Sequence, residues 1–159
     1  MRNSKYEITE KDKIIEFLKK NNTIRVAFTT DEAGPPYIVP LTYGFEYDHI
    51  LVFYFHGAPQ GRKVDLISKK RVVGFELDSI GEVKSAEQAC NFSVGYESII
   101  GTGGIFPVAD AEEKQHALNR IMYQLTGKDQ WDYPEKMLEM TAVFKLYVDE
   151  LSMKSHEMQ

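Results

Sequence analysis

The stretch Phe55–Lys63 reads Phe-His-Gly-Ala-Pro-Gln-Gly-Arg-Lys and joins two segments of different hydrophobic pattern. Before it, residues 50–55 are almost all apolar, which predicts a strand buried on both faces. After it, apolar residues recur at helical spacing over 61–70, which predicts a helix that opens on Gly61, Arg62 and Lys63. Two fixed positive charges at a helix N-terminus suit a phosphate or another small anion. An exposed turn with solvated charges explains these residues equally well.

The stretch is not a P-loop, although its glycines and lysine invite that comparison. Gly57 and Gly61 are one residue too close for the pattern GxxxxGK[ST], and Arg62 separates Gly61 from the lysine. Val64 replaces the hydroxyl residue that would hold magnesium. These departures exclude a site for nucleoside triphosphates. A site that binds phosphate without magnesium remains as a hypothesis. His56, at the strand end, either adds a hydrogen bond to the anion or bonds the backbone of the turn.

The segments before this stretch predict one helix and two strands. Residues 9–20 have helical spacing, with a threonine N-cap and basic residues in the last turn. Residues 23–30 and 37–47 alternate, which predicts strands. In the second strand Pro40 cannot donate to a ladder, and Gly44 permits close approach of a ligand or another backbone. A bend in a barrel strand explains both residues equally well.

The segments that follow the stretch predict more strand. Residues 71–77 form a fourth strand by pattern, and the polar residues 78–88 indicate a loop. Residues 89–108 alternate but carry four glycines, which predicts a long, strongly coiled strand. Cys90 falls at the start of this alternation, so we expect an inert buried thiol.

Helix and strand signals also mark the C-terminal part of the chain. Asp110 predicts a capped helix that ends at Gly127, and Pro134 can open a short helix. Residues 141–151 alternate cleanly, which predicts a final strand, and 152–159 are expected to form a frayed tail. Strands dominate and the helices separate them, so we expect a single domain, 1–159, built as a small barrel with helices outside it.

Bulk composition excludes several classes of function. The chain has 159 residues and a net charge of -5, which gives no basic field for nucleic acid. No apolar run reaches the length of a membrane span, and no signal peptide is visible, so we expect a cytoplasmic protein away from the membrane. The single cysteine fits a reducing compartment, and the scattered histidines predict no metal site. The chain also lacks a GxSxG nucleophile elbow.

Several motifs together resemble one family of flavin proteins. The most specific is the string His-x-Ala-x-x-Gly-Arg-Lys at 56–63. The resemblance is to the pyridoxamine 5'-phosphate oxidase-like FMN-binding split-barrel proteins, in the branch of the nitroimidazole-resistance (Nim) proteins, and it covers about 10–149. The matching segments are Val39–Phe45, Tyr54–Ala58, Gly61–Lys63, Val72–Glu76 and Tyr96–Gly103, followed by a similar helix.

The resemblance implies a mainly β (α+β) fold, a six-stranded split β-barrel with peripheral helices. It implies a homodimer that binds FMN in clefts between its subunits. The phosphate of FMN would be held by Gly61, Arg62 and Lys63, with His56 nearby, and the flavin ring would lie along the backbone of Pro40, Leu41, Thr42 and Tyr43. Aromatic residues of the other subunit cover the ring in such dimers, and Trp131, the only tryptophan, is the candidate here.

The resemblance also implies an FMN-dependent oxidoreductase. Electrons would pass from NADH or NADPH through FMN to a small acceptor, as in a nitroimidazole reductase, and no side chain is assigned as catalytic because the flavin supplies the redox chemistry. The alternative is a flavin, deazaflavin or haem binding or carrier protein without turnover, in which His56 could ligate haem. A third hypothesis is a dimeric interaction domain with an empty cleft.

Overall fold

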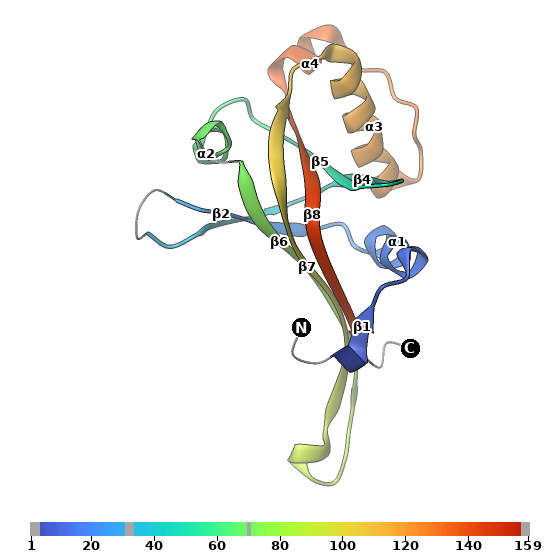
Figure 1. Ribbon diagram of the computed structural model, residues 1–159. Coiled ribbons are helices and arrows are strands. Elements are labelled where there is room, and N and C mark those ends of the chain that lie inside the picture. The colour runs from blue at the N-terminus through green and yellow to red at the C-terminus, as the bar shows by residue number, and fades with distance from the viewer. Residues whose placement is uncertain (1–3, 31–33, 70, 157–159) are drawn as a thin grey trace.

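A computed structural model describes residues 4–30, 34–69 and 71–156, and in these residues the fold is one antiparallel sheet with helices around it (Figure 1). Its strands are β1 (Glu7–Ile8), β2 (Ile24–Phe28), β3 (Tyr37–Leu41), β4 (Gly44–Tyr47), β5 (Leu51–Gly57), β6 (Val72–Lys84), β7 (Ser93–Val108) and β8 (Ala142–His156). Its helices are α1 (Lys11–Lys20), α2 (Arg62–Lys69), α3 (Ala111–Thr126) and α4 (Glu135–Met140), with 3-10 turns at Ser4–Tyr6 and Ala89–Asn91.

The order of the strands makes the sheet a split barrel. It runs β3-β2-β6-β7-β8-β5-β4, with β1 added on β8. The two ends of this path, β3 and β4, follow each other in the chain and are joined only by Thr42 and Tyr43. The sheet therefore curls round until its edges meet at this link. The expected split-barrel fold is confirmed, although 37–47 forms two strands rather than one because β3 pairs with β2 and β4 pairs with β5.

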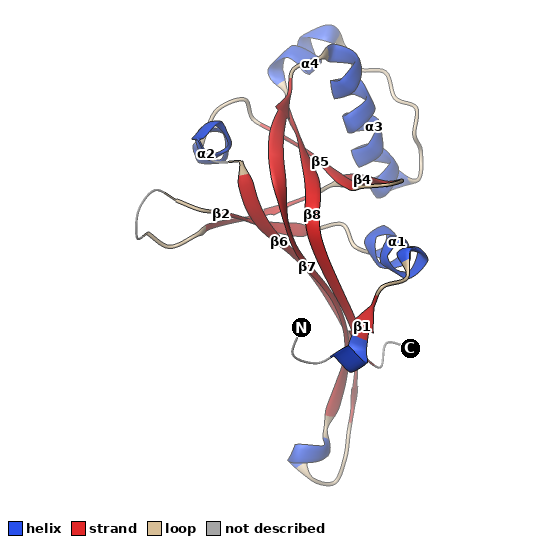
Figure 2. Cartoon of the chain, viewed as in Figure 1, coloured by secondary structure: helices blue, strands red, loops and turns tan. Residues whose placement is uncertain are grey.

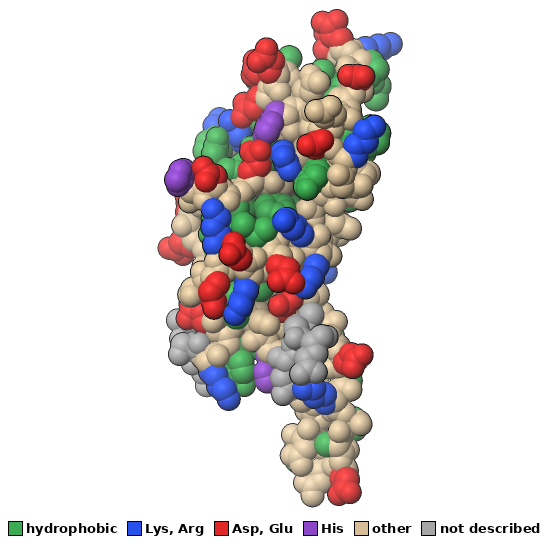
Figure 3. Space-filling view, turned by 90° about the vertical axis from the view of Figure 1, so that its right-hand side faces the viewer, with side chains coloured by type: hydrophobic (Ala, Val, Ile, Leu, Met, Phe, Trp, Pro, Cys, Tyr) green, Lys and Arg blue, Asp and Glu red, His purple; other side chains and the backbone are tan. Residues whose placement is uncertain are grey.

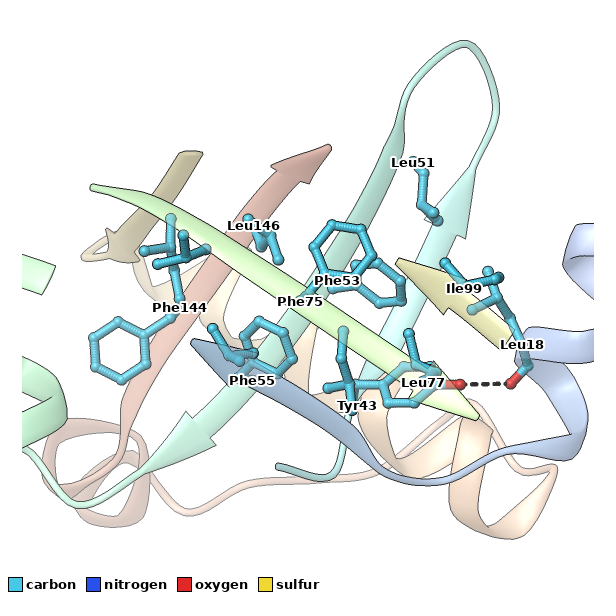
Figure 4. Packing of buried hydrophobic residues seen from close by; sticks show 14 of the residues in the cluster. Leu18, Tyr43, Leu51, Phe53, Phe55, Phe75, Leu77, Ile99, Phe144 and Leu146 are labelled. Carbon is cyan, nitrogen blue, oxygen red and sulfur yellow. Dashed lines mark hydrogen bonds between the residues drawn. The ribbon is translucent and has the colours of Figure 1, made fainter. Parts of the chain in front are cut away.

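Tyr43 closes the barrel from inside. Its side chain is fully buried, and its hydroxyl donates a hydrogen bond of 2.8 Å to the carbonyl of Leu18 at the end of α1 (Figure 4). Its ring lies edge-on to Phe53, 5.3 Å between centroids. This contact ties the β3–β4 link and α1 to the same aromatic core. The other buried rings and aliphatic side chains drawn there are Leu51, Phe55, Phe75, Leu77, Ile99, Phe144 and Leu146.

The helix α3 covers the outside of β4 and β5 (Figure 2). The Asp110 side chain accepts a hydrogen bond of 2.9 Å from the Glu113 N–H, and Gly127 ends the helix in the left-handed conformation at φ 73°. Both ends agree with the sequence. At Gly44 a Cβ would overlap the backbone of α3, so this glycine lets helix and strand backbones meet. The close approach of the α3 backbone therefore accounts for Gly44, and no ligand is needed to explain it.

The hairpin of β6 and β7 extends past the body of the molecule, at the lower end of Figure 1. The prediction of a loop over 78–88 is wrong, because β6 continues to Lys84 and pairs with β7 through Val83 and Val94. A strand exposed on both faces needs no apolar alternation, so its sequence resembles a loop. Cys90 lies exposed in the 3-10 turn at the tip, which corrects the expected buried thiol.

The ends of the chain differ from the sequence-based expectation. The strand β8 continues to His156, where 152–156 were expected to fray, because β1 and β7 both pair with it and Met153 is buried. Residues 157–159 of the expected tail lie outside the described part. The helix α1 begins after Glu10 rather than Thr9, and no side chain caps it. Among the described residues, no helix combines the length and apolarity that crossing a membrane requires.

Candidate functional site

The turn between β5 and α2 has a backbone that only glycine adopts readily. Gly61 has φ 125°, and no atom lies within 4 Å of the place where a Cβ would stand, so backbone conformation rather than space requires the glycine. Its carbonyl accepts the Asp65 N–H at 3.1 Å, which starts the helix. Arg62 and Lys63 therefore occupy the first turn of α2, where free backbone N–H groups favour an anion.

Both cations of this turn lie against aromatic rings and not against carboxylates. The Arg62 guanidinium is 4.5 Å from the ring centroid of Tyr37, and the Lys63 ammonium is 5.5 Å from that of Phe144. Neither forms an ion pair with a carboxylate in the described residues. Burial lowers the pKa of Lys63, since its ammonium has lost water without gaining a counter-ion. An anion bound here would restore the missing partner.

His56 lies at the end of β5, opposite Val143 of β8. Its pKa is below the usual 6.5, first because neighbouring atoms displace water from the ring and second because the Lys63 charge is close. The imidazole is therefore neutral at pH 7 and can donate through one nitrogen and accept through the other. The structure brings His56 and Lys63 together, as the resemblance implied, and leaves both sequence-based roles of His56 open.

The segment expected along a flavin ring is the end of β3 and its link to β4. Pro40 and Thr42 are exposed, whereas Leu41 packs against the core. The Tyr43 side chain is buried, and burial raises the pKa of its hydroxyl well above the usual range. Its backbone is the part that could line a ligand. The side chains of Pro40 and Thr42 are the ones available outside the barrel.

A scan against protein-family models decides the family. The model described as pyridoxamine 5'-phosphate oxidase matches residues 10–155. The chain belongs to the pyridoxamine 5'-phosphate oxidase family. The structure of a putative 5-nitroimidazole antibiotic resistance protein from Bacteroides thetaiotaomicron is similar, with 32% identity, a TM-score of 0.79, and coverage of 94% of this chain and 86% of that one. This likeness confirms the resemblance to the Nim branch.

More distant structures share the fold. The flavocytochrome Anf3 from Azotobacter vinelandii has 19% identity and a TM-score of 0.78, over 96% of this chain and 70% of its own. The FAD and haem binding protein from Mycobacterium smegmatis has 18% identity and a TM-score of 0.80, over 97% and 75%. No curated protein sequence matches the chain significantly. The pyridoxamine 5'-phosphate oxidase fold thus covers nearly the whole of this chain.

Within a single chain, Trp131 lies far from the β5–α2 turn. It stands in the loop from α3 to α4, on the right of Figure 1, whereas α2 is on the left. Its indole N–H donates to the Lys128 carbonyl at 2.9 Å, and the Lys128 ammonium lies 4.6 Å from its ring. A role over the flavin thus requires a second subunit, as the resemblance implied, and stays a prediction.

A polar cluster that the sequence pattern did not predict lies on the outside of the sheet. Glu46 of β4 accepts a hydrogen bond of 2.9 Å from the Tyr54 hydroxyl, and its Oε1 lies 2.9 Å from His116 Nε2 and 4.0 Å from Arg120 Nε. These four residues are called the β4–α3 cluster below. Burial and then the bond to Glu46 raise the pKa of Tyr54 well above its usual range. The only signal in the sequence was His116 beside the apolar stripe of its helix.

The β5–α2 turn is open on the single chain. None of the five surface hollows identified among the described residues is lined by His56, Arg62 or Lys63. Residues 58–62 are exposed, so the single chain leaves this turn open. No group of three metal-ligating side chains occurs in the part of the chain that the structure describes.

Proposed function

We propose that the protein is an FMN-binding flavoprotein and an oxidoreductase that passes electrons from a reduced nicotinamide through FMN to a small acceptor. The observation that carries the proposal is the pair Arg62 and Lys63 at the start of α2, without carboxylate partners in the described residues and with Lys63 partly desolvated. A dianionic phosphate at this helix start would satisfy both charges and the free N–H groups.

The described residues fit FMN at the phosphate end. Arg62 and Lys63 would donate to the phosphate, Gly61 allows the backbone to approach it, and His56 stands within reach of the Lys63 charge. The backbone of Pro40–Tyr43 would line the ring. When bound, the flavin supplies the redox chemistry. The chain's own tasks are to hold the phosphate, to orient the ring and to keep water away.

A homodimer would provide the walls that one chain lacks. Ile38, Val72 and Ile100 lie on one face of the sheet and are 57%, 68% and 56% exposed. A second copy that covers this apolar face would bury it and close the open site. Trp131 of the partner is the candidate to cover the ring.

The names of similar structures support flavin binding, but they differ in the second cofactor or the function that they mention. The structures from A. vinelandii and M. smegmatis are named a flavocytochrome and an FAD and haem binding protein. The B. thetaiotaomicron protein, at 32% identity, is named for nitroimidazole resistance. A small nitroaromatic compound is therefore the first acceptor to test.

The direct test is a titration of the purified protein with FMN. We expect flavin absorbance that survives desalting, or quenching of FMN fluorescence by protein stripped of flavin. Riboflavin, which lacks the phosphate, should bind at least about 100-fold more weakly if two charge-assisted bonds are lost. Equal affinity for riboflavin and FMN would contradict the phosphate clamp, and absence of binding would refute the flavin proposal.

Reduction separates an enzyme from a carrier. Under anaerobic conditions, NADH or NADPH should bleach the bound flavin, and a nitroimidazole should restore its absorbance. A flavin that neither nucleotide reduces would support the second candidate, a flavin, deazaflavin or haem carrier. The neutral imidazole of His56 favours that candidate where haem is concerned, because a metal ligand must be unprotonated. A Soret band that His56→Ala abolishes would establish it.

The dimer is tested by sedimentation. Ile100→Glu places a charge on the exposed sheet face and should weaken both self-association and FMN binding. Ile50→Glu is the matched control, since Ile50 is 57% exposed but lies in the turn before β5. A monomer that binds FMN with full affinity would refute the site between subunits.

A further inference from the structure

A hollow lies on the other side of the molecule from the β5–α2 turn. It has a volume of about 590 Å³ and is enclosed by the last turn of α1, by β4 with the residue after it, and by one face of α3. In Figure 1 these elements stand on the right, and α2 stands on the left. The lining residues are Lys19, Phe45, Glu46, Tyr47, Asp48, Arg120, Tyr123 and Gln124.

The walls of this hollow are held in place by hydrogen bonds. The Gln124 side-chain amide donates to the Leu18 carbonyl at 2.8 Å and to the Asn21 carbonyl at 2.7 Å, which fastens α3 to the end of α1. The Lys11 ammonium donates to the Asp48 carbonyl and lies 4.9 Å from the Tyr47 ring, which fixes the third wall. The hollow is thus formed before any ligand arrives.

Two positive charges in this hollow lack a full partner. Arg120 Nε is buried and makes no hydrogen bond in the described residues. Its guanidinium lies 4.9 Å from the Tyr123 ring. Lys19 is exposed, and its ammonium forms no ion pair or hydrogen bond with any described residue. A charged group with an unmade hydrogen bond is costly to bury. Because Nε itself is out of reach, a ligand in the hollow accepts from the rest of the guanidinium, on a side chain that is 28% exposed.

The two carboxylates that line the hollow, Glu46 and Asp48, do not fully neutralise the charges of Arg120 and Lys19. Glu46 Oε2 accepts a hydrogen bond from Tyr54, and Glu46 Oε1 lies 2.9 Å from His116 Nε2 and 4.0 Å from Arg120 Nε, which is too far for a hydrogen bond. Asp48 lies 88% exposed at the rim, where water screens it. The interior of the hollow therefore favours a negative group between Arg120 and Lys19.

The remaining lining is aromatic. Phe45 and Tyr47 come from β4, and Tyr123 comes from α3. Figure 3 looks onto this side of the molecule and shows hydrophobic atoms in the middle of the face with Lys and Arg side chains on both sides of them. Flat rings pack well on such surfaces, and a monocyclic ring with one anionic group fits the volume.

We propose that this hollow binds a small aromatic carboxylate. The carboxylate accepts hydrogen bonds from Arg120 and Lys19, and the ring packs against Phe45, Tyr47 and Tyr123. The site is separate from the proposed flavin site, and its occupant does not touch the β5–α2 turn. It is a ligand site in addition to the site of electron transfer.

The test uses benzoate, with benzamide as the uncharged analogue of the same shape. Nuclear magnetic resonance of labelled protein should show benzoate-dependent shifts at the amides of 45–48 and 120–124. Benzamide should bind at least about tenfold more weakly, the loss expected for one charge-assisted bond. Equal binding of the two compounds, or shifts confined to other residues, would overturn the proposal.

Two variants and one control locate the site. Arg120→Met and Lys19→Met keep the length of the stem and should each weaken benzoate binding about tenfold. Lys20→Met removes the next charge of α1, which pairs with Glu16 at 2.7 Å, and should leave binding unchanged. If Arg62→Ala with Lys63→Ala abolishes the binding instead, benzoate occupies the β5–α2 turn and the proposal fails. Circular dichroism of each variant confirms that it is folded.

Discussion

The β5–α2 turn and the β4–α3 cluster both place cations beside aromatic rings, yet they treat the charges in opposite ways. In the cluster, Glu46 provides a carboxylate that accepts a hydrogen bond from Tyr54 and lies 2.9 Å from His116 Nε2. In the turn, Arg62 and Lys63 face rings alone, and no carboxylate of the described residues compensates them. The cluster thus holds a carboxylate of its own, 4.0 Å from Arg120 Nε, whereas the turn leaves both of its cations without one.

This contrast predicts two different responses to mutation. Substitutions in the turn should change ligand affinity and leave the free energy of unfolding nearly constant, because the side chains of Arg62 and Lys63 lose only their contacts with aromatic rings and no ion pair. Substitutions in the cluster and at its packing contact should lower the free energy of unfolding and leave FMN affinity unchanged. A variant with both effects would show that the regions are coupled.

The largest effect is expected in the turn. Arg62→Ala with Lys63→Ala should weaken FMN binding by about 3 kcal/mol or more, because each charge-assisted hydrogen bond is worth about 1.5–3 kcal/mol. The free energy of unfolding, from urea titration, should stay close to that of the parent. Fluorescence titration with FMN measures the first quantity.

The control for this variant removes the same number of charges elsewhere. Lys13→Ala with Lys20→Ala acts on α1, where both lysines are exposed; Lys13 pairs with Glu10 at the N-cap and Lys20 with Glu16. It should leave FMN affinity within the error of the titration. An equal loss in both double variants would mean that net charge and not the clamp governs binding.

The next effect is expected where α3 meets β4. Gly44→Ala should lower the free energy of unfolding by about 1–3 kcal/mol, the range for overpacking, because the added Cβ overlaps the helix backbone. Gly57→Ala is the matched control in the turn. Its Cβ would meet only the Lys63 ammonium at 2.8 Å, which a flexible side chain can avoid. Urea unfolding of both variants measures the difference, and similar losses would contradict the packing argument.

A smaller effect is expected from the carboxylate of the cluster. Glu46→Gln keeps the shape but weakens the hydrogen bond from Tyr54 and removes the charge beside His116. It should cost about 1 kcal/mol of unfolding free energy, since Glu46 is partly exposed. FMN affinity should not change. A loss of FMN binding without loss of stability would assign the cluster to the flavin site and remove the contrast.

The sequence predicted the turn better than the cluster for a physical reason. Gly61, Arg62 and Lys63 are neighbours in the chain, and their conformation follows from local rules for helix starts and glycine. The Glu46 and His116 pair joins residues 70 positions apart through the packing of α3 on β4, which no local pattern encodes. Composition and spacing therefore indicated the turn and its two cations, whose role as an anion site stays a prediction, whereas the carboxylate cluster required the structure.

In the fold as well, features set by neighbouring residues were predictable from the sequence, whereas features set by long-range contacts were not. The capped ends of α3 were readable because Asp110 and Gly127 act within one turn of the helix. The split of 37–47 into β3 and β4 was not, because it follows from the Tyr43 bond to Leu18 and from the closure of the barrel. The hairpin tip at Cys90 was also misplaced, since its strands are stabilised by pairing with each other and not by burial.

The smallest expected effect is a change in the pKa of His56 when FMN binds. Its pKa lies below 6.5 in the folded chain, so the unfolded chain binds more protons as the pH falls through that range. The stability that the neutral ring contributes is complete above pH 6.5 and is lost as the pH falls through the folded-state pKa. A bound phosphate would reverse the sign of the local charge and raise the pKa of His56. Histidine resonances followed by pH titration with and without FMN measure the shift.

Lys63→Met separates the two causes of that lowered pKa. Burial is the larger cause and the Lys63 charge the smaller, so the variant should raise the pKa of His56 only part of the way to its usual value. His116 serves as the internal reference, because Glu46 and not Lys63 is its partner and its resonance should not respond. If FMN leaves the pKa of His56 unchanged while it binds tightly, the phosphate is not near this ring. His56 then serves the turn or the substrate, and only the two cations and the helix start remain as the clamp.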